Sequence, residues 1–144
     1  MKAEREKLKR LQRLERVRAI AKQTAATEAA RAEGTYAQLT QLAQRTGQLA
    51  ADYAARTDIT DGAALRGMNR FAAGLQGIRA ATQADASRAQ AIADKRQQEL
   101  AAAERRRAAV EDRAAAQARH MAARQSYAML AGQLQATKRR DPQD

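Results

Sequence analysis

Two long stretches of this sequence contain almost nothing that stops an α-helix. They run from about residue 4 to 56 and from about residue 63 to 138, and the one proline of the chain, Pro142, lies beyond both. Between them stands Thr57-Asp58-Ile59-Thr60-Asp61-Gly62, which is rich in residues that favour turns. The sequence therefore predicts two long helices that fold back on each other at one turn.

This pattern predicts an all-α fold, an antiparallel two-helix coiled-coil hairpin in the form of a long rod. Thr60 or Asp61 can cap the second helix through a side-chain oxygen. The whole chain, residues 1–144, is expected to be one domain, with a disordered tail over residues 139–144.

The composition agrees with long helices and argues against other classes of protein. Ala, Gln, Glu, Arg, Lys and Leu dominate, as in coiled coils. Most of the 44% of hydrophobic residues are alanine, which suits a thin seam between helices better than a globular core. We expect no membrane span, because no run of about 18 apolar residues occurs. The residues near the N-terminus include no apolar region of the kind that a secretory signal contains, so we expect no such signal. The lack of cysteine fits a protein of the cytosol.

The net charge of +11 is unevenly distributed. Residues 1–22 hold nine Lys and Arg against three Glu, a net charge of +6, and residues 96–144 hold ten against six, a net charge of +4. Residues 23–95 are nearly neutral, with eight basic residues against seven acidic ones. Folding at residue 60 would bring residue 1 alongside about residue 119, so both basic pieces would share the open end. A basic end and a neutral turn end suggest two different partner surfaces.

Residues at alternating steps of three and four predict the seam between the helices. In the first helix this stripe is Leu11, Leu14, Arg18, Ala21, Ala25, Glu28, Ala32, Thr35, Leu39, Leu42, Thr46, Leu49 and Tyr53. In the second it is Phe71, Leu75, Ile78, Thr82, Asp85, Ala89, Ile92 and Arg96, then, after a stutter, Leu100, Ala103, Arg107, Val110, Ala114, Gln117 and Met121. The longer second helix should overhang the first, and the overhang should carry His120, Tyr127, Met129, Leu130 and Leu134.

No motif of an enzyme is present in the sequence. It contains no phosphate-binding P-loop, no dinucleotide-binding glycine pattern and no zinc-protease or hydrolase signature. His120 is the only histidine, and a two-helix rod offers no large concave site. We therefore expect a protein without catalytic residues, cofactor or metal, which works by binding other proteins.

The central segments resemble the flagellar FliJ family, the stalk component of the flagellar type III export apparatus. The resemblance is carried by Gln38-Leu39-Thr40-Gln41-Leu42, then a glycine-containing turn, then Phe71-x-x-x-Leu75-x-x-Ile78. It covers roughly residues 36–82, and the helical layout is similar from end to end. The resemblance implies a hairpin similar to the stalk of the rotary ATPase γ subunit.

The resemblance also implies partners. Members of that family insert their terminal coiled coil into the pore of a hexameric export ATPase, contact the cytoplasmic part of the export gate and bind emptied export chaperones. The implied location is the cytoplasm, at the inner membrane of the flagellar base. The gate-binding candidates carried over are Gln38, Leu42, Phe71, Leu75, Ile78 and Thr82. The ATPase-binding candidates at the basic end are Arg10, Leu11, Arg13, Leu14, Arg16, Arg105, Arg106 and Arg107.

Three other interpretations of the sequence stay open. The chain could be the equivalent stalk of a virulence injectisome, or a structural or adaptor coiled coil with no role in secretion. A basic rod that binds nucleic acid fits the charge, but aromatic residues make up only 3% of the chain. The side chains on which bases would stack are therefore scarce, and we expect no nucleic-acid partner.

Overall fold

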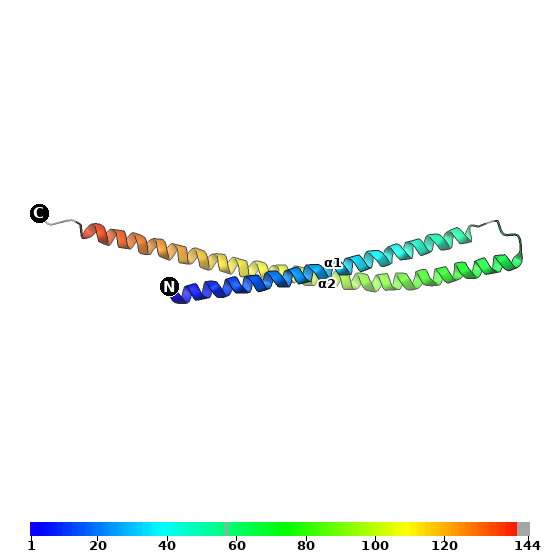
Figure 1. The fold of residues 1–144 in the computed structure, drawn as a ribbon, viewed down its shortest axis with the longest axis horizontal. Coiled ribbons are helices and arrows are strands. Elements are labelled where there is room, and N and C mark those ends of the chain that lie inside the picture. Colours follow the sequence, from blue (N-terminus) through cyan, green and yellow to red (C-terminus); the bar gives the residue numbers. More distant parts are fainter. Residues whose placement is uncertain (57, 141–144) are drawn as a thin grey trace. The chain divides into compact units, whose positions relative to one another are not determined.

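Two long helices, packed against each other in opposite directions, make up the protein (Figure 1). The computed structural model describes residues 1–56 and 58–140. Helix α1 spans Lys2–Ala54 and helix α2 spans Gly62–Lys138, within two residues of the predicted ends. No strand occurs in the described residues, so the all-α hairpin is confirmed. Thr57 in the turn and residues 141–144 of the tail lie outside the described residues.

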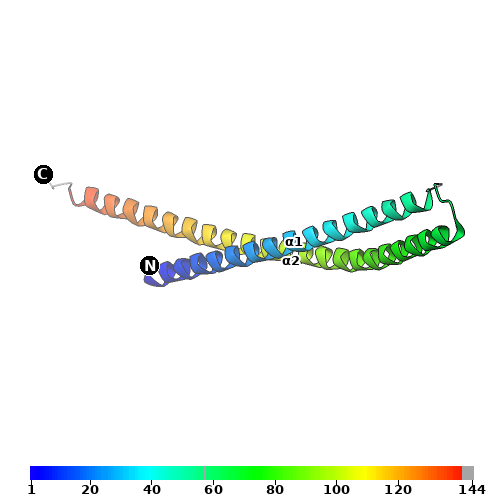
Figure 2. The same ribbon diagram turned by 45° about the vertical axis from the view of Figure 1, so that its right-hand side comes forward.

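The chain divides into two compact units. The turn unit is Thr24–Ala101, and the terminal unit combines Met1–Gln23 with the chain from Ala102 onwards. In the turn unit, the second half of α1 runs beside the first part of α2, and the turn joins them at one end (Figures 1 and 2). The expectation of a single domain stays a prediction.

The start of α2 is fixed by Asp61. Its carboxylate Oδ1 accepts a hydrogen bond from the backbone N–H of Ala64 at 2.7 Å, and its carbonyl accepts one from the N–H of Leu65 at 3.2 Å. Such a bond satisfies one of the backbone donors that the first turn of a helix leaves without a partner. Asp61 is therefore the capping residue, one of the two that the sequence suggested.

The seam of α1 repeats at alternating steps of three and four residues and is rich in alanine. In the turn unit its buried members are Ala29, Ala43, Thr46 and Ala50, with Ala32, Tyr36 and Leu39 half-buried between them. Ala29 and Ala50 are each only 1% exposed. Small side chains let two helix backbones approach closely, so the seam buries little volume at each step.

The predicted α1 seam was right at every second position and one residue early at the others. Leu14, Leu42 and Leu49 are 38%, 50% and 43% exposed. Together with Ala21, Glu28 and Thr35 they lie beside the seam, whose corresponding members are Glu15, Lys22, Ala29, Tyr36, Ala43 and Ala50. The physical reason is close approach: when alanines face the partner helix, the leucines next to them cover the margin of the contact.

The seam of α2 keeps one phase throughout, which overturns the predicted stutter. Its buried members are Leu75, Thr82, Ala86, Ala89, Ala93, Val110, Ala114 and Met121. Half-buried Arg96, Leu100 and Arg107 continue the same steps of three and four. The apparent stutter arose because Phe71, Ile78, Asp85 and Ile92 were taken as seam residues, whereas all four are exposed.

The pairing of the helices is offset from the predicted folding point at residue 60. Tyr53 meets Phe71, and Glu4 forms an ion pair with Arg124, so residue 1 does not lie beside residue 119. These two contacts put the midpoint of the pairing at about residues 62 to 64, because the first turns of α2, which begins at Gly62, precede its contact with the end of α1.

The offset also shortens the predicted overhang. His120 precedes the buried Met121 and so lies in the paired part of α2, not on the overhang. Met1 and Met129 line the same surface pocket, so the pairing reaches close to Met129. Leu130 and Leu134, which are 55% and 71% exposed, follow it.

Candidate interaction surfaces

One side of the turn unit carries large apolar side chains that the seam does not bury. These residues, which we call the apolar edge, are Leu42, Leu49, Phe71, Ile78 and Ile92. Each immediately precedes a seam residue, because half-buried Ala72 and Arg79 also belong to the α2 seam, and their exposed fractions lie between 43% and 55%. A row of half-exposed apolar side chains from two helices is typical of a surface that contacts another protein.

An ion-pair cluster shows that residues preceding the seam lie on the same side in both helices. Glu28 of α1 and Glu99 of α2 each immediately precede a seam residue. Both accept a hydrogen bond from Nη1 of Arg96, at 3.1 Å and 2.9 Å. One guanidinium can reach both carboxylates only if they share a side, so the apolar residues in the same phase share that side too.

An aromatic pair lies at the turn end of the apolar edge. The rings of Tyr53 and Phe71 meet edge to face, with centroids 4.7 Å apart and planes at 66°. The guanidinium carbon of Arg56 lies 4.6 Å from the centre of the Tyr53 ring. These contacts fix the position of Phe71 although 47% of its surface stays exposed.

The six gate-binding candidates divide into three groups. Leu42, Phe71 and Ile78 belong to the apolar edge, and Gln38 is exposed apart from it. Leu75 and Thr82 are buried in the seam, at 8% and 7% exposure. The Thr82 hydroxyl donates a hydrogen bond to the carbonyl of Ile78 at 2.8 Å. The structure therefore brings three of the six together on one accessible surface.

The ATPase-binding candidates of the terminal unit differ in their exposure and in whether they form ion pairs within the chain. Five of the candidate arginines are exposed, namely Arg10, Arg13 and Arg16 on α1 and Arg105 and Arg106 on α2. Leu11 is half-buried in the seam and Leu14 is 38% exposed beside it. Arg107 is instead held within the chain, by Glu104 at 2.9 Å and Glu111 at 2.7 Å.

Glu104 is the centre of the ion-pair network in the terminal unit. It accepts hydrogen bonds from Arg107, and Lys22 of α1 lies 2.8 Å away. The hydrogen bond from Arg107 and, to a smaller extent, that from Lys22 lower the pKa of Glu104 to about 2. The hydrogen bond to Glu104 in turn raises the pKa of Arg107. The network links α1 to α2 by charge at a place where the seam contains polar residues.

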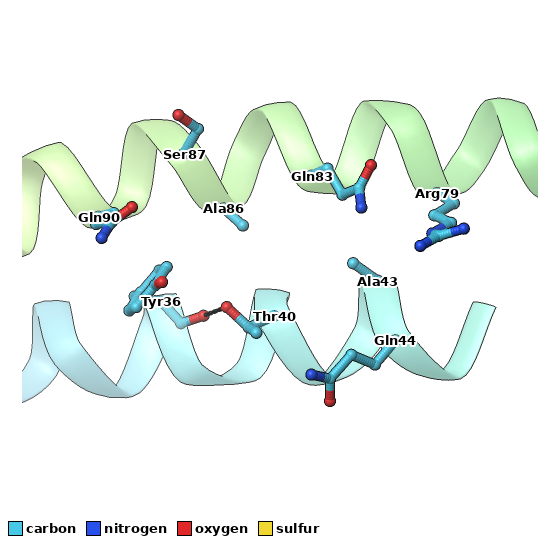
Figure 3. A pocket seen from close by; sticks show the side chains of 9 residues that line it. All are labelled: Tyr36, Thr40, Ala43, Gln44, Arg79, Gln83, Ala86, Ser87 and Gln90. Carbon is cyan, nitrogen blue, oxygen red and sulfur yellow. Dashed lines mark hydrogen bonds between the residues drawn. The ribbon is translucent and has the colours of Figure 1, made fainter. Parts of the chain in front are cut away.

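A polar groove on the turn unit was not anticipated from the sequence. It has a volume of about 310 Å³ and is lined by Tyr36, Thr40, Ala43, Gln44, Arg79, Gln83, Ala86, Ser87 and Gln90 (Figure 3). Gln83 and Gln90 each immediately follow a seam residue, whereas the apolar edge consists of residues that precede one. The heptad spacing of these glutamines was a signal in the sequence, but their role depends on what faces them.

Other features bear on the class of protein. Among the described residues, no group of three or more His, Cys, Asp or Glu could hold a metal ion. Within residues 1–56 and 58–140, neither helix is long and apolar enough to cross a membrane. Comparison with known proteins found no matching family model, curated protein or solved structure.

Proposed function

We propose that this protein is a stalk and escort component of the flagellar type III export apparatus, acting by binding and not by catalysis. The observation that carries the proposal is the apolar edge. Leu42, Phe71 and Ile78, three positions that the resemblance assigns to the export gate, are half-exposed on one side of the hairpin. A residue that only packed the seam would not be accessible to a partner.

The second part of the proposal concerns the export ATPase. Exposed arginines on both helices of the terminal unit offer a basic surface, whereas residues 23–95 are almost neutral. This division supports a protein that binds two partners through different chemistry. In this proposal the terminal unit binds the hexameric ATPase and the turn unit binds the gate. Emptied export chaperones are further partners, and the protein works in the cytoplasm at the inner membrane.

Charge reversal tests the ATPase contact. Changing Arg10, Arg13 and Arg16 to Glu should abolish co-purification with a hexameric export ATPase and remove any stimulation of its hydrolysis. The matched control reverses Arg31, Arg45 and Arg70, which are exposed on the turn unit, and should leave binding unchanged. Both variants must keep the helicity of the parent in circular dichroism. If both variants lose binding equally, the loss follows from the change in net charge, and a specific basic surface on the terminal unit is contradicted.

A second experiment tests the gate contact. Phe71→Ala should abolish pull-down by the cytoplasmic domain of an export gate at a temperature where the variant is still folded. Ile92→Ala is the control, because Ile92 lies on the same apolar edge but outside the segment that carries the resemblance. If Phe71→Ala lowers the melting temperature but still binds the gate, Phe71 is a structural residue and the gate assignment fails. Absence of ATPase and gate binding in the parent protein would favour an adaptor without a role in secretion.

A further inference from the structure

Three half-buried arginines occupy seam positions of α2: Arg79, Arg96 and Arg107. Arg96 binds Glu28 at 3.1 Å and Glu99 at 2.9 Å. Arg107 binds two carboxylates as well, in the network described above. A cation at a half-buried position is costly unless a carboxylate compensates it, and these two arginines each have a pair of them.

Arg79 is the exception among the three. No carboxylate of residues 1–56 or 58–140 lies within 4 Å of its guanidinium, and its buried Nε has no hydrogen-bond partner there. The sequence explains the difference. Arg107 has Glu104 three residues before it and Glu111 four residues after it, whereas Arg79 has Gln76 and Gln83 at the same offsets. Arg79 thus has neutral amide side chains at the two positions where Arg107 has its carboxylate partners.

The position of the Arg79 side chain depends on Gly47 of α1. A Cβ atom at Gly47 would lie 2.8 Å from Nε of Arg79, which is closer than Cβ contacts in proteins, and 3.1 Å from its Cδ, which is a tight contact. The arginine therefore passes over α1 at a point where that helix has no side chain. This contact holds the guanidinium at the end of the polar groove (Figure 3).

The groove next to Arg79 has the size and the chemistry to accept an acidic side chain. Ala43 of α1 and Ala86 of α2 point toward the opposite helix at different places along the groove and fill little of it, with Arg79 near one end and Tyr36 near the other (Figure 3). Its volume of about 310 Å³ exceeds that of a carboxylate group. The lining contains amides and hydroxyls but no Asp or Glu, so nothing in it repels an anion.

We infer that the polar groove is a binding site for a carboxylate side chain of another protein, which pairs with Arg79. The guanidinium matches a carboxylate in charge and can bind it through two parallel hydrogen bonds. We infer a carboxylate as the ligand because Arg96 and Arg107, which occupy seam positions of the same helix, each form ion pairs with glutamate side chains. The inference does not rest on a role in export, because it depends only on residues of the turn unit.

The test follows the side-chain N–H signal of Arg79 in the full-length protein by nuclear magnetic resonance, with Arg79→Lys used to assign it. The probe is an alanine-based helical peptide that carries glutamates at heptad spacing, and its control has glutamines instead. The glutamate peptide should shift the signal, whereas the glutamine peptide should not. Following one residue separates this site from binding to the basic terminal unit. Inorganic phosphate forms a further arm, and we expect a weaker response to it.

Gln83→Glu provides the decisive variant because it keeps Arg79 and gives it an internal counterion, as Glu111 does for Arg107. It should weaken binding of the glutamate peptide, measured at the Arg79 signal, by about tenfold. Gln48→Glu adds the same charge at an exposed position outside the groove lining and should leave the affinity unchanged. Unaltered affinity in Gln83→Glu would overturn the inference, as would an Arg79 signal that ignores the glutamate peptide. An equal response to phosphate would overturn the assignment to a carboxylate.

Discussion

Tyr53 and Phe71 close the hairpin beside the turn, their rings edge to face at 4.7 Å. This contact joins the last turn of α1, which ends at Ala54, to the third turn of α2, which begins at Gly62. Because Phe71 also lies on the apolar edge, one side chain serves both the fold and the proposed partner surface.

The aromatic pair should contribute a measurable coupling energy. We expect a double-mutant cycle of Tyr53→Ala and Phe71→Ala to give a coupling of about 0.5–1.5 kcal/mol, as for other edge-to-face pairs. The free energies of unfolding come from urea titrations followed by circular dichroism. Since Phe71 is 47% exposed, its single substitution should cost less than the roughly 3–5 kcal/mol of a fully buried phenylalanine. Additive single and double variants would show that the rings do not stabilise each other.

Stability should fall in acid because of Glu104. Its pKa is lowered to about 2 in the folded protein from an ordinary value of 4.5, so its contribution is fully present above pH 4.5. That contribution is lost as the pH falls from about 4.5 to about 2. The difference in melting temperature between the parent and Glu104→Gln should therefore shrink over this range. Asp112→Asn is the control, because Asp112 is exposed and has no ion pair in the described part of the chain; a parallel change in that variant would contradict the role of Glu104.

Two glycine substitutions should have different effects although both glycines lie within α1. Gly34→Ala should stabilise the protein by up to about 1 kcal/mol, the usual gain in helix propensity, because in residues 1–56 and 58–140 no atom beyond the adjoining turns of α1 lies within 4 Å of the new methyl group. Gly47→Ala should lose that gain because the methyl group would displace Arg79. In an Arg79→Ala background the gain at Gly47 should return. Urea unfolding of the four variants decides, and equal gains at both glycines in the parent would refute the contact.

The register of the hairpin can be tested by chemical crosslinking. Because Tyr53 faces Phe71 and Gly47 faces Arg79, residue 49 should lie nearly opposite residue 78. A short thiol-reactive crosslinker should therefore join Leu49→Cys to Ile78→Cys within one chain, and faster than it joins Leu42→Cys to Ile78→Cys. Gel mobility and mass spectrometry distinguish links within a chain from links between chains. Links formed only between chains would rule out the hairpin in solution.

The helices and the cap could be predicted because their causes are local. The turn residues before Gly62 and the absence of proline from both helices act on the chain where they stand. The phase of the seam could not be predicted in the same way. Leu42 and Ala43 are neighbours, and burying either gives a regular stripe. The choice depends on how closely α2 approaches, which no single helix encodes.

The candidate site was predictable to the same limited degree. Leu42, Phe71 and Ile78 were expected at a partner surface and are accessible, whereas Leu75 and Thr82 are not. The polar groove was not predicted, because the heptad spacing of Gln83 and Gln90 does not show what faces them, and the position of Arg79 depends on its pairing with Gly47. That pairing follows from the register, which was offset from the predicted one.

Two helices that meet through alanines have little to distinguish one alignment from another that is displaced by seven residues. In the native alignment Arg96 lies between Glu28 and Glu99. After a slip of one heptad, the residue of α1 nearest to Arg96 would be Ala21 or Thr35, and the bond across the helices would be lost. An exposed ion pair adds little to the free energy of folding. Here its larger effect is to disfavour the slipped alignments, so that charge decides which alanines meet.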